Sequence, residues 1–160
     1  MRQRAWSRLR RDEQGTSLAE FALLSPVLFT LIFGIIEMAL IFNAWVTVQD
    51  ASARGARYAV TGQTTCSSGG SGRAGCIISE SRVPLTNLRN GASSTVTITS
   101  YGYPSYSATL AGDPGNQCDA VEVRVQYTYN VMTPIISRLF STVTLTGRQR
   151  FISEPFLRCG

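Results

Sequence analysis

A single carboxylate stands at the start of a long apolar run, close behind a basic segment. Residues Gly15 to Phe21 read GTSLAEF, and five arginines lie within the first eleven residues. An unpaired charge inside a bilayer costs about 2.5 to 3.5 kcal/mol, so a carboxylate at the edge of this apolar run calls for a partner. The carboxylate could also serve its own chain, since Ser17 and Glu20 have the spacing of a capping box at a helix start. Both roles stay open at this point.

Cysteine chemistry is the second candidate, because the chain holds four cysteines after residue 60: Cys66, Cys76, Cys118 and Cys159. Four cysteines allow three pairings, and the short separation of Cys66 and Cys76 suits a local disulfide. We prefer Cys66 with Cys76 and Cys118 with Cys159. A zinc site is disfavoured, because the chain has no histidine and lacks the short paired spacings of structural zinc ligands.

A glycine motif is the third candidate. Residues 70 to 75 read GSGRAG, which matches the G-x-G-x-x-G of dinucleotide sites, but that function needs a strand before the motif and a helix after it. The sequence predicts neither, so we expect a flexible loop closed by the Cys66–Cys76 disulfide. The absence of histidine excludes Ser-His-Asp and Cys-His catalysis. We therefore expect neither an enzyme nor a cofactor.

The element that positions Glu20 is a long helix predicted over residues 16–60. Within it, residues 21–42 contain Glu37 as their only charge and are long enough to cross a hydrocarbon core of roughly 30 Å. The whole helix would be about 67 Å long, so its second half should form a stalk outside the membrane. A stripe of small residues in this half predicts a face that another element approaches closely: Ala44, Val48, Ala51, Gly55 and Ala59.

Two residues inside the predicted span need an explanation. Pro26 removes a backbone donor, so we expect a kink or local unwinding there. Glu37 would lie about 25 Å beyond Glu20, near the opposite edge of the core. We interpret Glu37 as a side chain that extends to the interface, in preference to a partner contact.

The charge distribution predicts the orientation. The formal charge of +5 is concentrated in the leader, residues 1–15, and the remainder is close to neutral. Arginines ahead of a span stay in the cytoplasm, so residues 61–160 should lie outside, where disulfides persist. Nucleic-acid binding is not expected, because the outer part carries no basic surface of the required strength.

The outer part should be a small antiparallel sheet. Alternating segments predict strands at 93–99, 121–129 and 142–153, with 101–118 as a loop and 133–140 as one or two helical turns. In the second strand, one face holds Val121, Val123, Val125, Tyr127 and Tyr129, and the other holds Glu122, Arg124 and Gln126. We interpret the tyrosines of this domain as packing residues in preference to an adhesive face. The predicted fold class is α+β, a long helix whose outer half packs on the sheet.

The residues around Glu20, taken together, resemble a processing signal of a known class of precursor proteins. Gly15, the glutamate in the fifth position after it and the adjacent Phe21, behind a basic leader, resemble the class III signal of type IV pilin precursors. Together with Ser25-Pro26, FGIIE (33–37) and ASARGARYAVTG (51–62), the pattern is similar to the TadE-like family of minor pseudopilins from tight-adherence (Tad/Flp) pilus systems. The resemblance covers about residues 13–62 well and the β-rich remainder only loosely, through a closing strand that ends near Glu154.

This resemblance implies that a prepilin peptidase cuts between Gly15 and Thr16, and that Glu20 and Phe21 serve subunit assembly. It implies a pilin-like, single-pass protein of the bacterial cytoplasmic membrane, incorporated in a pilus or held at its base, in a system for cell adhesion. The implied partners are the peptidase, other pilins and pseudopilins, the Tad inner-membrane assembly platform and membrane lipid. TadE and TadF types both fit. The alternative is an uncleaved, membrane-anchored binding domain in which Ser17 and Glu20 only cap the helix.

Overall fold

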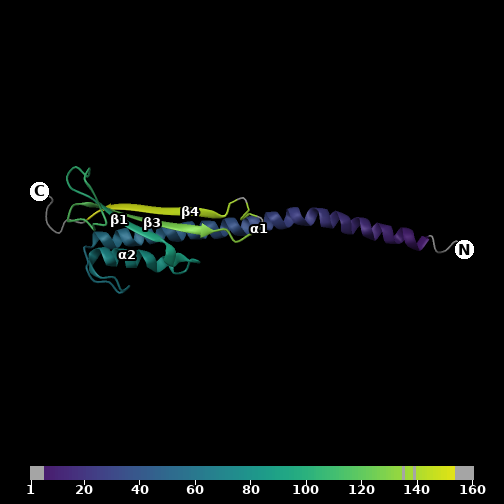
Figure 1. Ribbon diagram of the computed structural model, residues 1–160, viewed down its shortest axis with the longest axis horizontal. Helices are drawn as coiled ribbons and strands as arrows, with labels where there is room; N and C mark the ends of the chain where they lie inside the picture. The colour runs from purple at the N-terminus through teal and green to yellow at the C-terminus, as the bar shows by residue number, and fades with distance from the viewer. Residues whose placement is uncertain (1–5, 135, 139, 154–160) are drawn as a thin grey trace.

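The computed structural model describes residues 6–134, 136–138 and 140–153, with side chains from residue 16 onward. The elements are helix α1 (Trp6–Val60), helix α2 (Gly72–Leu85), the 3-10 turn η1 (Gly91–Ser93), and strands β1 (Thr95–Tyr101), β2 (Thr109–Ala111), β3 (Ala120–Asn130) and β4 (Thr142–Ile152). Figure 1 shows that the first half of α1 projects alone, while α2 and the sheet lie along its second half. This is the α+β arrangement that the sequence predicts.

Helix α1 is longer and more continuous than predicted. It begins at Trp6, within the basic leader, and it remains helical through Pro26. Pro26 cannot donate to the carbonyl of Ala22, four residues earlier, but Ser25 Oγ donates to that oxygen over 3.5 Å. Of the predicted kink or local unwinding, the unwinding is wrong, and the Ser25 hydroxyl gives the Ala22 carbonyl a replacement donor.

The four strands form one antiparallel sheet in the order β2-β1-β3-β4. Strands β1, β3 and β4 confirm the three strands predicted from alternation. Strand β2 lies inside the segment 101–118, which the sequence predicts as a loop. It spans three residues and pairs with the end of β1, from Thr99 with Ala111 to Tyr101 with Thr109. A strand this short leaves no detectable alternation in the sequence.

The inner face of the sheet packs against the helices. The residues predicted for that face of β3 are all buried: Val121, Val123, Val125, Tyr127 and Tyr129. Arg124 and Gln126 are exposed on the opposite face, as predicted. Glu122 differs, since only 6% of it is exposed. Arg148 Nη2 lies 2.7 Å from its carboxylate, and Tyr101 Oη donates to it over 3.1 Å.

The small-residue stripe of α1 is the surface on which the domain packs. All five predicted residues, Ala44, Val48, Ala51, Gly55 and Ala59, are buried. The contact is close enough to require glycine on both sides. A Cβ on Gly55 would lie 1.9 Å from Ser81 Oγ of α2, and a Cβ on Gly147 of β4 would lie 2.4 Å from the Val48 backbone oxygen. The stripe therefore lets both α2 and the sheet approach the α1 backbone.

The glycine motif differs from its prediction. Helix α2 begins at Gly72, inside GSGRAG, so the expectation that no helix follows is wrong. The dinucleotide interpretation still does not apply, because the described strands all pair in antiparallel fashion and that function uses a parallel βαβ unit. The predicted Cys66–Cys76 disulfide is present and joins the loop after α1 to α2. The predicted Cys118–Cys159 pair involves Cys159, which lies outside the described residues.

Arg73, inside the same motif, joins three segments at the far end of the domain. Its guanidinium donates to the carbonyl of Ala59 at the end of α1 over 2.8 Å, and to the carbonyl of Gly115 before β3. It also lies 3.4 Å from Ser153 Oγ, just after β4. One side chain therefore links the end of α1, the segment before β3 and the end of β4.

Replacement of Gly147 by alanine should destabilise the domain, because the new Cβ would collide with the backbone of α1. Overpacking costs roughly 1 to 3 kcal/mol, so the midpoint of thermal unfolding, followed by circular dichroism, should fall by several degrees. Gly102→Ala is the matched control, since the nearest atom to its Cβ would be 4.0 Å away. Equal midpoints for both variants would contradict the close contact between α1 and β4.

Candidate functional site

The first candidate region is the part of α1 that the domain does not cover. From Thr16 to Ile36 every residue is exposed except Ser25 and Gly34, which are half-buried. This free segment carries twelve of the exposed large apolar side chains: Leu18, Phe21, Leu23, Leu24, Val27, Leu28, Phe29, Leu31, Ile32, Phe33, Ile35 and Ile36. At about 1.5 Å per residue it is roughly 31 Å long, close to the ~30 Å of a hydrocarbon core. Helix α1 is thus long and apolar enough to cross a membrane.

The predicted assembly residues lie near the start of this free segment. Glu20 and Phe21 are both exposed, and within the described residues Glu20 makes no hydrogen bond or ion pair. Gly15 and Thr16 lie in the middle of a continuous helix. Ser17 is therefore not a helix N-cap, so the capping-box interpretation of Ser17 and Glu20 is wrong for this chain. The carboxylate of Glu20 is left available to another molecule.

The second candidate region is Glu37, at the first contact between α1 and the domain. Only 3% of Glu37 is exposed. One carboxylate oxygen accepts from Tyr129 Oη at 2.9 Å and from the Met132 amide at 3.0 Å. The other accepts from the Thr133 amide at 3.1 Å and from Thr133 Oγ1 at 2.6 Å. We call Glu37 with these three residues the Glu37 junction.

The junction corrects the sequence-based interpretation of Glu37. That interpretation had the side chain reach the membrane interface, whereas the carboxylate is buried and has four donors. A buried carboxylate is tolerated when hydrogen bonds replace its hydration, and bonds to a charged acceptor are the stronger class. The donors follow Glu37 by 92 to 96 positions in the chain, and two of them are backbone amides. No local pattern in the sequence could have indicated them.

Tyr129 is suited to its role in the junction. Burial, reinforced by the hydrogen bond to Glu37, raises the pKa of Tyr129 to about 12. The phenol therefore remains protonated, and able to donate to the carboxylate, throughout the physiological range. The sequence placed Tyr129 correctly on the inner face of β3 but gave no sign of this bond.

The remaining tyrosines fit the interpretation as packing residues. Tyr127 is buried and donates to the Arg89 carbonyl. Tyr101 and Tyr106 are half-buried and donate to Glu122 and to the Cys118 carbonyl. Tyr103 is 44% exposed, and one exposed ring does not make an adhesive face.

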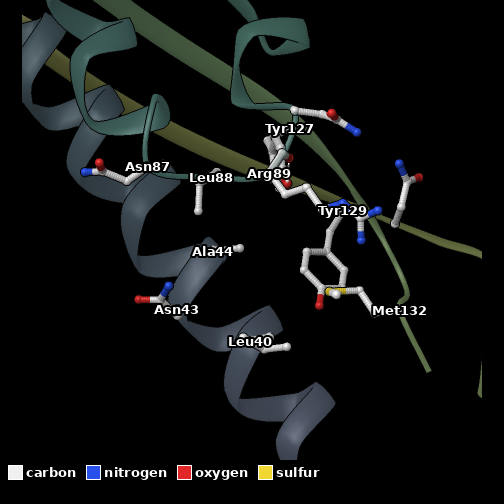
Figure 2. Close-up of a pocket in the computed structure, with 11 residues that line it drawn as sticks. Leu40, Asn43, Ala44, Asn87, Leu88, Arg89, Tyr127, Tyr129 and Met132 are labelled. Atoms are coloured by element: carbon white, nitrogen blue, oxygen red, sulfur yellow. Dashed lines mark hydrogen bonds between the residues drawn. The ribbon is translucent and has the colours of Figure 1, made fainter.

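A pocket of ≈ 130 Å³ lies directly beyond the junction, between α1, the segment after α2, and β3. Figure 2 shows Leu40, Asn43 and Ala44 on the α1 side, with Tyr129 and Met132 across from them. Among the described residues that line it, none is a carboxylate or a thiol. The described part of the chain also contains no cluster of metal-binding side chains. The polar groups of the pocket are the amides of Asn43, Asn87, Asn90 and Asn130, the guanidinium of Arg89 and the phenols of Tyr127 and Tyr129.

Comparison with known proteins locates the likeness in α1. The family model described as TadE-like protein matches residues 15–57. No curated protein matches this chain, and no solved structure does. The match confirms the resemblance predicted from the sequence. It begins at Gly15 and ends one turn before the end of α1, so α2 and the sheet lie outside it.

Neutralising Glu37 should loosen the junction. In Glu37→Gln the amide group would face donors and leave some of them unpaired, and each buried unpaired donor costs about 1 to 3 kcal/mol. Amide hydrogen exchange at Met132 and Thr133 should accelerate by at least tenfold, the equivalent of about 1.4 kcal/mol. Asp50→Asn neutralises an exposed carboxylate on the same helix and should leave these amides protected. Unchanged exchange in Glu37→Gln would contradict the importance of the four bonds.

Proposed function

We propose that this chain, TadE-like over residues 15–57, is a minor pseudopilin that takes part in assembly of a Tad-type pilus. It inserts in the cytoplasmic membrane with its basic leader inside and its sheet domain outside. A prepilin peptidase removes the leader after Gly15. The protein then acts by association with other subunits and has no turnover of its own.

The observation that carries this proposal is the coincidence of the family match with the uncovered helix. The match covers residues 15–57 and therefore includes the whole exposed stretch from Thr16 to Ile36. The apolar surface of this stretch has no partner within the described chain, and apolar surfaces of this extent mark contacts with lipid or protein. We place the membrane span at residues 16–36 in preference to 21–42, because the domain already covers α1 from Glu37.

The arrangement also supports a contact with other subunits beyond the membrane. Phe42, Trp45 and Val46 lie past Glu37, and each remains at least 43% exposed. The Phe42 and Trp45 rings are neighbours, with centroids 5.7 Å apart. Alongside the domain, the helix of a neighbouring pilin or pseudopilin would cover these side chains. Assembly would then use one continuous face of α1.

Glu20 gives this association its register. After cleavage, Thr16 would carry an ammonium group, and Glu20 of a neighbouring subunit could pair with it. Because an unpaired charge in the bilayer is costly, the pairing favours one axial position of the two helices over others. Before assembly, Glu20 lies about 6 Å from the start of the free segment and can reach the interface.

Two features of the chain support the orientation. Arginines dominate the leader, which keeps that end in the cytoplasm. The Cys66–Cys76 disulfide lies in the domain at the other end, and disulfides persist in the compartment outside. The assembly platform of the pilus would meet the protein from the cytoplasmic side.

Processing is the first test of the proposal. The intact mass and amino-terminal sequence, from membranes of cells with and without a prepilin peptidase, should show a start at Thr16 only where the peptidase is present. Gly15→Leu should leave the precursor uncut, because a bulky residue blocks the subsite and strengthens a helix that the protease must open. Gly34→Ala, on the same helix with open space around its Cβ, should be cut normally. An intact leader in every case would support the uncleaved, membrane-anchored alternative.

Association is tested separately. Glu20→Ala should be inserted and cut, yet its recovery with other pilins should fall about tenfold for each 1.4 kcal/mol of lost pairing. Ser17→Ala is the control, because it removes another exposed polar side chain one turn away and leaves the carboxylate in place. Equal recovery of Glu20→Ala and the unmodified protein would refute the role given to Glu20.

A further inference from the structure

The described residues of the β3–β4 loop, 131–134, 136–138 and 140–141, lie at the end of the domain nearest the free segment. Figure 1 shows this loop beside α1, where the helix leaves the domain. The loop is held in shape by hydrogen bonds from the Ser137 amide to the Thr133 carbonyl, 2.8 Å, and from the Phe140 amide to the Ile136 carbonyl, 2.9 Å. Despite this order it exposes two large apolar side chains, with Met132 55% and Phe140 67% exposed.

The Glu37 junction fixes the height of this loop relative to the helix. The amides of Met132 and Thr133 bind the Glu37 carboxylate, so the loop begins at the level of residue 37. Below that level, the free segment has the length of one hydrocarbon core. If the free segment spans the membrane, the loop therefore lies at the boundary between acyl chains and headgroups.

An apolar groove opens at the same level. It has a volume of ≈ 290 Å³ and runs between α1 and the loop, lined by Phe33, Ile36, Glu37, Leu40, Met132, Thr133 and Pro134. Glu37 is the only carboxylate among these lining residues, and it is buried with four donors. The groove therefore presents aliphatic and aromatic surface to an occupant, with no exposed negative charge.

The charge of this end suits a phospholipid. Residues 131–141 contain one charged residue, Arg138, and it is exposed. Arg89, beside the pocket of Figure 2, is exposed as well. A cation close to exposed apolar side chains fits the interfacial layer, where phosphates lie next to acyl chains.

We propose that this end of the domain sits directly on the bilayer surface, with Met132 and Phe140 in the interfacial layer and an acyl chain of a phospholipid in the groove. The inference rests on the membrane insertion in the proposed function. It adds a lipid-binding surface on the domain itself, formed by the β3–β4 loop and the turn of α1 below it. The bilayer would then hold the domain at a fixed height and tilt, and so present α1 to neighbouring subunits in one orientation.

Photocrosslinking in proteoliposomes tests this surface. The full chain, reconstituted in phosphatidylethanolamine and phosphatidylglycerol, would carry benzoylphenylalanine in place of one residue at a time: Met132, Phe140, Phe29 or Leu110. Phe29 lies in the free segment and reports insertion. Leu110, on β2 at the opposite end of the domain, is 59% exposed and matches the two loop positions in exposure. All four sites are at the surface, so the substitutions should leave the fold intact.

The expected result is a phospholipid adduct, identified by mass, from positions 29, 132 and 140 and none from 110. Adducts from 29 alone would overturn the inference and leave the membrane anchor intact, because the domain would then stand clear of the bilayer. Adducts of 132 and 140 to a second copy of the chain would also overturn it, since the groove would then be a protein interface. Absence of lipid at 29 would refute the membrane span in the proposed function, and the lipid surface with it.

Discussion

The Glu37 carboxylate accepts four hydrogen bonds from Tyr129, Met132 and Thr133, and the division of α1 into two halves depends on it. Toward the amino terminus the helix is largely exposed, and toward the carboxyl terminus it is the central element of the domain. A carboxylate buried without donors would be prohibitively unstable. The end of β3 must therefore stay beside this turn of α1 for the domain to fold as it does. The boundary between the two halves is set by one charged group.

At the opposite end of the domain, a positively charged side chain donates hydrogen bonds to groups that are distant in the chain. Arg73 donates to the carbonyls of Ala59 and Gly115 and approaches Ser153. Between Glu37 and Arg73, the stripe of small residues lets β4 and α2 approach the helix backbone. The second half of α1 is thus fixed at both ends and closely packed along its length.

Sequence patterns predicted the parts of this fold that repeat locally. The helical period over 16–60, the alternation in β3 and the spacing of Cys66 and Cys76 all correspond to observed structure. Helix α2 was not predicted, because its sequence starts with a glycine-rich turn and includes Pro84. Both features favour a loop. The junction was missed for a different reason, since its donors are distant in the chain and half of them are backbone amides. Hydrogen bonds between one side chain and residues distant in the chain produce no periodic pattern in the sequence.

The two carboxylates of the apolar helix, about 25 Å apart, have opposite environments. Glu37 has all of its hydrogen bonds supplied by its own chain, whereas Glu20 has none within the described residues and lies on an exposed apolar surface. The Glu37 end of the exposed segment is thus satisfied within the chain, whereas the Glu20 carboxylate is not. A charge in an apolar medium needs a cation or hydrogen-bond donors to stabilise it, and for Glu20 these would have to come from another molecule or from water at an interface. The family likeness, over residues 15–57, includes both carboxylates and leaves α2 and the sheet outside it.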